Sequence, residues 1–133
     1  MSTTKTEAVI VALMAAAGAN QAVSTIWPYP GKWLIDTTKT GIVGAAVTQD
    51  ATNVTLIALT NVTASKTYVS HDTTTGQGGT LVVDALTATG LSLLTGTGLI
   101  VTQGDVIKLA KTDGGTGKAW AGTGVITAKH VQG

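Results

Sequence analysis

The residues that could do acid–base or nucleophilic chemistry are few and scattered. The 133-residue chain has two histidines, His71 and His130, and no cysteine. Ser70, His71 and Asp72 supply the residue types of a hydrolase triad. They are consecutive, however, and neighbouring side chains on a strand point to opposite faces of the sheet. We therefore predict that these three residues form no triad, that the chain holds no catalytic site and that it is not an enzyme.

Metal and cofactor sites are not indicated either. The aspartates are dispersed and never form the Asp-x-Asp-x-Asp-Gly ladder of a calcium loop. Without cysteine there is no thiolate metal site, and no paired-histidine zinc motif occurs. The segment Thr112–Lys118 (TDGGTGK) is similar to a phosphate loop, but Ala119 stands where Ser or Thr is needed and no helix is indicated after it. We expect no metal, no cofactor and a hairpin connection at 112–118.

The charge pattern argues against nucleic acid as a partner. The net charge is +1, the basic residues are eight lysines spread from Lys5 to Lys129, and there is no arginine. Arginine is the side chain that forks onto phosphate and guanine, and nucleic-acid-binding surfaces gather their positive charge on one face. We expect no nucleic-acid binding.

The elements that would position any site are predicted to be strands. Only 11% of the residues are charged, and roughly one residue in five is threonine, a β-branched type that favours sheets. Short apolar runs recur about every ten residues, as in sandwiches and barrels. Strands are predicted at Ala22–Trp27, Lys32–Thr37, Gly41–Val47, Asn53–Thr60, Thr67–Ser70, Thr80–Asp84, Leu91–Leu94, Leu99–Thr102, Asp105–Lys111 and Gly122–Val131. A polar loop is expected at 71–79. The prediction is an antiparallel, jelly-roll-like β-sandwich over residues 21–133.

Residues 1–20 form a separate apolar arm or helix in this prediction. The segment Glu7–Ala17 (EAVIVALMAAA) has good helix formers, Thr4 and Glu7 fit a capping box, and Gly18 fits a helix end. An extended docking arm and a signal peptide are the other interpretations, although Glu7 is poorly placed for a signal. The segment is shorter than the about 20 apolar residues of a membrane span, and no membrane association is expected.

An aromatic cluster surrounds the two prolines of the chain. Trp27, Tyr29 and Trp33 lie within seven residues of one another. Aromatic side chains of this kind favour the core or a subunit contact, and a sugar-stacking surface is the alternative.

The C-terminal third resembles a known structural family. Gly104–Leu109, Asp113–Thr116 and Ala121–Thr127 resemble the last strands of small β-sandwich decoration (cement) proteins of tailed-bacteriophage heads. The resemblance implies a virion protein on the outer capsid surface, commonly a trimer, that clamps neighbouring copies of the major capsid protein.

The predicted function is therefore structural: decorating and stabilising a phage capsid by bridging coat subunits. The predicted contact residues are Val9, Ile10, Val11, Leu13, Met14, Trp27, Tyr29 and Trp33. Deleting residues 1–17 is expected to weaken capsid binding and leave the sheet folded. The alternative is a carbohydrate- or receptor-binding module of a phage fibre or spike, using the aromatic cluster and the loop at 71–79.

Overall fold

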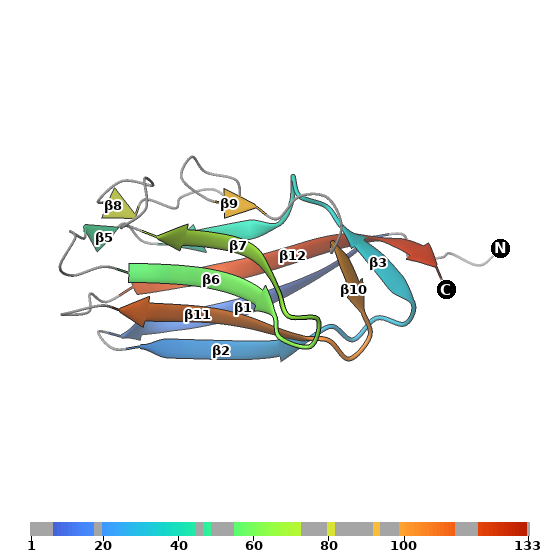
Figure 1. Cartoon of the computed structure of the whole chain (residues 1–133), viewed down its shortest axis with the longest axis horizontal. Coiled ribbons are helices and arrows are strands. Elements are labelled where there is room, and N and C mark those ends of the chain that lie inside the picture. The colour runs from blue at the N-terminus through green and yellow to red at the C-terminus, as the bar shows by residue number, and fades with distance from the viewer. Residues whose placement is uncertain are drawn as a thin grey trace.

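The protein is built from two facing antiparallel β-sheets (Figure 1). The computed structural model describes residues 7–17, 20–44, 47–48, 55–72, 80–81, 92–93, 99–113 and 120–132. The first sheet has the order β1 (Glu7–Ala17), β12 (Trp120–Gln132), β3 (Lys32–Ile35) and β10 (Ile100–Thr102), with β4 (Gly41–Gly44) also paired to β12. The second has the order β2 (Gln21–Ile26), β11 (Val106–Asp113), β6 (Thr55–Asn61), β7 (Lys66–Asp72) and β9 (Ser92–Leu93). A short pair joins β5 (Val47–Thr48) to β8 (Thr80–Leu81).

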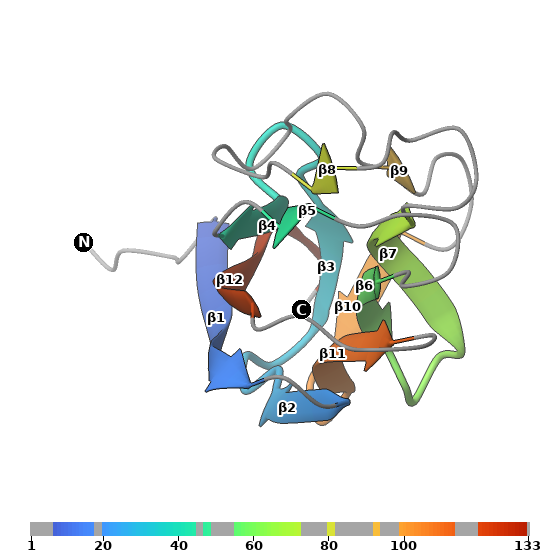
Figure 2. The same ribbon diagram turned by 90° about the vertical axis from the view of Figure 1, so that its left-hand side faces the viewer.

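The all-β class and the sandwich architecture predicted from the sequence are confirmed. Each predicted strand overlaps a strand of the structure. The end-on view shows the first sheet curling around one side of the molecule, with β1 and β2 as neighbouring margins of the two sheets (Figure 2). Most of the loop predicted at 71–79 and of the connection predicted at 112–118 lies outside the described residues.

The N-terminal helix is not present, and that interpretation was wrong. Glu7–Ala17 forms strand β1, which pairs antiparallel with β12 from Glu7 opposite Lys129 to Ala17 opposite Trp120. A helix that is apolar on every side needs cover on every side. As a strand, the same segment buries alternate side chains and bonds its backbone to the long β12, so tertiary pairing overrides the helix propensity of alanine.

The core consists of the inward-facing side chains of both sheets. On β6, Ile57 and Leu59 are fully buried, and on β12 Ile126 and Ala128 are buried. Leu56 of β6 points outward and is 37% exposed. The apolar run of β6 predicts cover on both faces, but the described residues cover only the inner one.

Two glycines make room for the indole of Trp120. Gly44 and Gly122 lie opposite each other in the pairing of β4 and β12. A Cβ atom added to Gly44 or to Gly122 would lie 2.4 or 2.3 Å from the Trp120 ring, closer than real Cβ contacts allow. Trp120 thus folds over a pair of glycines and is fully buried.

Thr40 bridges the point where β12 changes its partner from β4 to β3. The Thr127 amide donates to the Thr40 hydroxyl oxygen at 3.1 Å, and the Thr40 hydroxyl donates to the Thr127 carbonyl at 3.2 Å. The Asp36 amide also donates to that carbonyl at 2.8 Å. Thr127 is buried, and these bonds give its backbone N–H and C=O groups the hydrogen-bond partners that buried backbone groups need.

Candidate interaction surface

The outer face of β1 carries a row of exposed apolar side chains. Val9, Val11 and Leu13 are 46%, 49% and 67% exposed. They are called the β1 stripe below. The alternate residues Ala8, Ala12 and Met14 are buried, and Ile10 packs partly buried against the core. The strand therefore separates the predicted contact residues of this segment: three face outward together, whereas Ile10 and Met14 face the core.

The neighbouring strands extend the apolar character of this face. Val125 lies opposite Val11 and Thr123 opposite Leu13 on β12, and Val43 of β4 lies opposite Thr123. All three are half-buried. An apolar strip therefore continues from the edge of the sheet towards its centre.

Charged residues gather at one end of the β1 stripe. The Lys39 ammonium lies 3.1 Å from the Glu7 carboxylate, and the Lys129 ammonium lies 3.8 Å from that of Asp36. Both lysines are well exposed, so each pair contributes little to stability in water. These pairs do bound the apolar strip at the end where β1 begins.

The aromatic cluster is brought together, but mostly in the core. Trp27 and Trp33 are 0% and 2% exposed. The ring centroids of Trp27 lie 5.1 Å from Tyr29 and 5.8 Å from Trp33, in edge-to-face arrangements. Tyr29 is half-buried, and its hydroxyl donates to the Val9 carbonyl at 3.3 Å. The cluster thus anchors the loop after β2 against β1, with two of its three predicted rings buried.

His130 is a member of this cluster that the sequence-based list of contact residues omitted. Its ring centroid lies 4.8 Å from that of Trp33, its partner across β12 and β3. The alternation of β12 contains the signal, because it places His130 on the same side as the buried Ile126 and Ala128. The partner strand could not be read from one sequence.

A buried hydrogen-bonded group, centred on Asn61 and Tyr68, joins the turn after β6 to the turn before β11. The Asn61 side-chain amide donates to the Tyr68 hydroxyl at 2.8 Å and to the Asp105 carboxylate at 2.9 Å. The Tyr68 hydroxyl donates onward to the Ile100 carbonyl at 3.2 Å. Burial raises the pKa of Tyr68, against the hydrogen bond from Asn61, so the phenol stays protonated near neutral pH.

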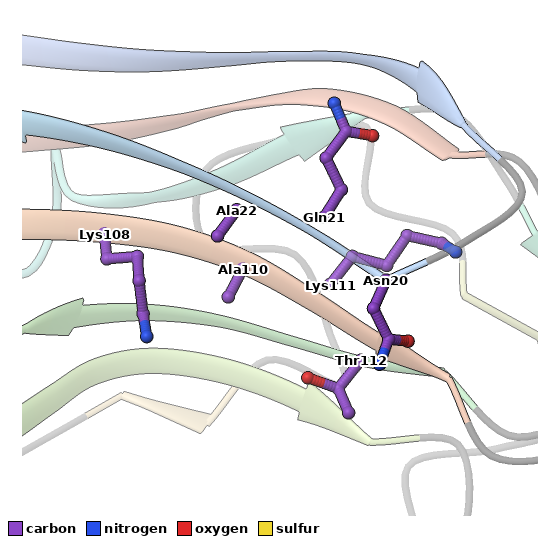
Figure 3. Close-up of a pocket in the computed structure, with 7 residues that line it drawn as sticks. All are labelled: Asn20, Gln21, Ala22, Lys108, Ala110, Lys111 and Thr112. Atoms are coloured by element: carbon purple, nitrogen blue, oxygen red, sulfur yellow. The ribbon is translucent and has the colours of Figure 1, made fainter.

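An open, shallow hollow lies on the outer face of β2 and β11 (Figure 3). The facing pair Ala22 and Ala110 is part of its lining, with Lys108 towards one end and Thr112 towards the other. Gln21 and Lys111 project from the opposite side of the two strands. A nucleophile must lie beside its base, and Lys108 and Thr112 are four positions apart on β11, towards opposite ends of the hollow.

Other chemistry-bearing residues are not gathered. Ser70, His71 and Asp72 all lie in β7, so the strand extends two residues into the segment predicted as a loop. Nothing is described of the side chains of His71 and Asp72. Within the described ranges, no three His, Cys, Asp or Glu residues are placed to hold a metal ion. The part of the chain that is described also contains no helix long and apolar enough to cross a membrane.

Comparison with known proteins yields no relative: no family model, curated protein or solved structure matches the chain.

Proposed function

We propose that this protein is a structural subunit that acts by contact: a capsid decoration protein that stabilises a phage head by binding the major capsid protein on its outer surface. The observation that carries the proposal is the β1 stripe, in which Val9, Val11 and Leu13 stand exposed side by side on a regular strand. Exposed apolar patches of this kind mark protein contact sites. The resemblance of the C-terminal strands to cement proteins supplies the kind of partner.

The surroundings of the stripe favour a protein surface as the partner. The half-buried Val125, Thr123 and Val43 adjoin it, and the ion pairs of Glu7 and Asp36 lie at one end. An apolar centre with a charged rim is the usual anatomy of a protein interface. The burial of Trp27 and Trp33 argues against the sugar-binding alternative, which needs exposed rings.

Co-sedimentation with heads assembled from the major capsid protein tests this function. The wild-type protein should travel with the heads, and Leu13→Lys should bind about ten- to a hundredfold more weakly, since burying a leucine is worth about 1.5–3 kcal/mol. Ile26→Lys is the matched control, because Ile26 is 58% exposed on β2 of the other sheet and the added charge is the same. Wild-type protein that stays in the supernatant, or equal losses in both variants, would refute the proposal.

A further inference from the structure

We propose that β1 also binds a second copy of this chain, by antiparallel pairing of the two β1 edges around a two-fold axis at Val11. The inference deepens the proposed function and rests on it for its purpose, because pairing would place two β1 stripes side by side on one continuous outer face. Such a face could touch two coat subunits at once. A two-fold contact closes on itself and gives a dimer, in place of the trimer that the resemblance implies.

The first observation is that β1 is the terminal strand of its sheet. Among the described strands it pairs with β12 alone, and in the end-on view it runs along one margin of the molecule (Figure 2). The Tyr29 hydroxyl donates to the Val9 carbonyl, but a carbonyl oxygen has two lone pairs and can accept a second bond. A terminal strand of 11 residues is long for an edge.

The second observation is that the residues of this edge lack most of the usual protection, although the loop after β2 contacts the edge where the Tyr29 hydroxyl donates to the Val9 carbonyl. Natural edge strands carry lysine, proline, a bulge or an inward charge that discourages further pairing. From Ala8 to Met14 there is no charge, no proline and no glycine. The only register shift in the pairing with β12 lies after Met14, at the end of the strand. Seven regular, apolar residues at an edge are a template for another strand.

The third observation is that the edge is complementary to itself in one register. A two-fold axis at Val11 puts Val9 opposite Leu13 of the second copy and Val11 opposite its own equivalent. The same axis places the two Glu7 side chains about 27 Å apart, at strand spacing and well beyond the screening length of about 8 Å. An axis at Val9 would halve that distance and set Glu7 against an apolar valine. Apolar match and charge placement therefore both favour an axis at Val11 over one at Val9.

The area involved indicates a weak dimer. A specific interface commonly buries about 800 Å² on each partner, and three half-exposed side chains with one strand edge supply only part of that. We therefore expect reversible pairing in solution, reinforced when one coat surface holds both copies. The test must accordingly capture a transient contact.

Single-cysteine crosslinking provides that test, because the chain has no cysteine of its own. Under mild oxidation Val11→Cys should give about tenfold more disulfide-linked dimer than Val9→Cys or Leu13→Cys alone, since a disulfide needs Cα atoms within about 7 Å. A mixture of the Val9→Cys and Leu13→Cys proteins should again crosslink, because those residues face each other across the axis. Val62→Cys is the control, at a residue that is 46% exposed in the turn after β6.

The outcomes separate this inference from the proposed function. Val11→Cys crosslinking no faster than Val62→Cys, or Val9→Cys alone crosslinking as fast as Val11→Cys, would overturn the pairing. If that happens while Leu13→Lys still binds heads about ten- to a hundredfold more weakly than wild type, the proposed function is supported and the dimer is refuted. If the predicted cysteine pattern appears and wild-type protein does not bind heads, the dimer stands and the capsid role falls.

Discussion

At the scale of single residues, Trp120 packs so closely on Gly122 that the glycine has no room for a methyl group. A Cβ at Gly122 would lie 2.3 Å from the indole and 2.7 Å from the Val43 carbonyl oxygen. At Gly124, on the same strand and face, the one contact below 3 Å is the end of the flexible Leu59 side chain. A methyl group at Gly124 could therefore be accommodated by movement of the Leu59 side chain, whereas a methyl group at Gly122 would press on a buried ring and on backbone.

We predict that Gly122→Ala lowers the free energy of unfolding by about 1–3 kcal/mol, as overpacking of a rigid core commonly does. Gly124→Ala should cost clearly less, because Leu59 can move. Chemical denaturation of both variants with tryptophan fluorescence as the signal measures the difference. If Gly124→Ala loses as much unfolding free energy as Gly122→Ala, or more, then Trp120 is not packed as tightly as the structure describes.

Asp36 links stability to pH. The Thr38 hydroxyl donates to the Asp36 carboxylate at 2.6 Å and the Thr38 amide at 3.0 Å, with the Lys129 ammonium at 3.8 Å. These contacts, the side chain of Thr38 first, hold the pKa of Asp36 below its ordinary value of 3.8. A carboxylate with a lowered folded-state pKa stabilises the protein above pH 3.8, and this contribution disappears as the pH falls through the folded-state value.

We therefore predict that Asp36→Asn destabilises the protein at pH 7 and that the gap from wild type narrows as the pH drops below 3.8. Urea denaturation at a series of pH values provides the measurement. Thr38→Val should reduce the same acid dependence, since it removes the leading contact while leaving Asp36 in place. A gap that stays constant down to the acid limit would contradict this role of Asp36.

At the scale of elements, the sequence predicts the strands from Ala22 onward well and leaves the N-terminal segment open between a helix and an extended arm. Every predicted strand from Ala22 onward has a counterpart, because alternation and glycine-rich breaks are local signals. Glu7–Ala17 has no such signal: its alanines favour a helix, whereas its valines and isoleucine fit a strand. Pairing with β12 makes this segment a strand. Because β12 lies more than a hundred residues away, one sequence could not show that the two segments pair.

The same limit applies to the candidate surface. The sequence identifies Val9, Val11 and Leu13 as contact residues, but only the strand geometry separates them from the buried Met14. It also identifies the aromatic cluster, but the burial of Trp27 and Trp33 depends on the loop after β2 packing beneath other strands. Tertiary packing decides which predicted contact residues remain on the surface.

The ties between turns were also beyond sequence reasoning. Asn61 holds the turn after β6 to the turn before β11 by bonding Tyr68 and Asp105, and the Thr63 hydroxyl accepts a bond from the Val106 amide at 3.0 Å. Asparagine and threonine in a turn are common for local reasons, so their long-range partners leave no mark on the sequence.

At the scale of the whole molecule, β1 is part of the sandwich's core. It contributes Ala8, Ala12 and Met14 to the buried cluster. It also pairs with one edge of β12 along most of the length of that strand. Removing it would expose the inner face of the second sheet and leave the long β12 as an open edge. The sequence-based expectation that the sheet stays folded without residues 1–17 therefore does not follow from this architecture.

We predict instead that deleting residues 1–17 destroys or strongly destabilises the whole fold. The three tryptophans are all buried, so their fluorescence should shift to the red, and the cooperative thermal transition in circular dichroism should disappear or move to much lower temperature. Leu13→Lys is the control, because it alters the exposed face of β1 and leaves the pairing with β12 intact. A truncated protein with buried tryptophans and an unchanged midpoint would make residues 1–17 a dispensable arm, and their deletion would then test capsid binding directly.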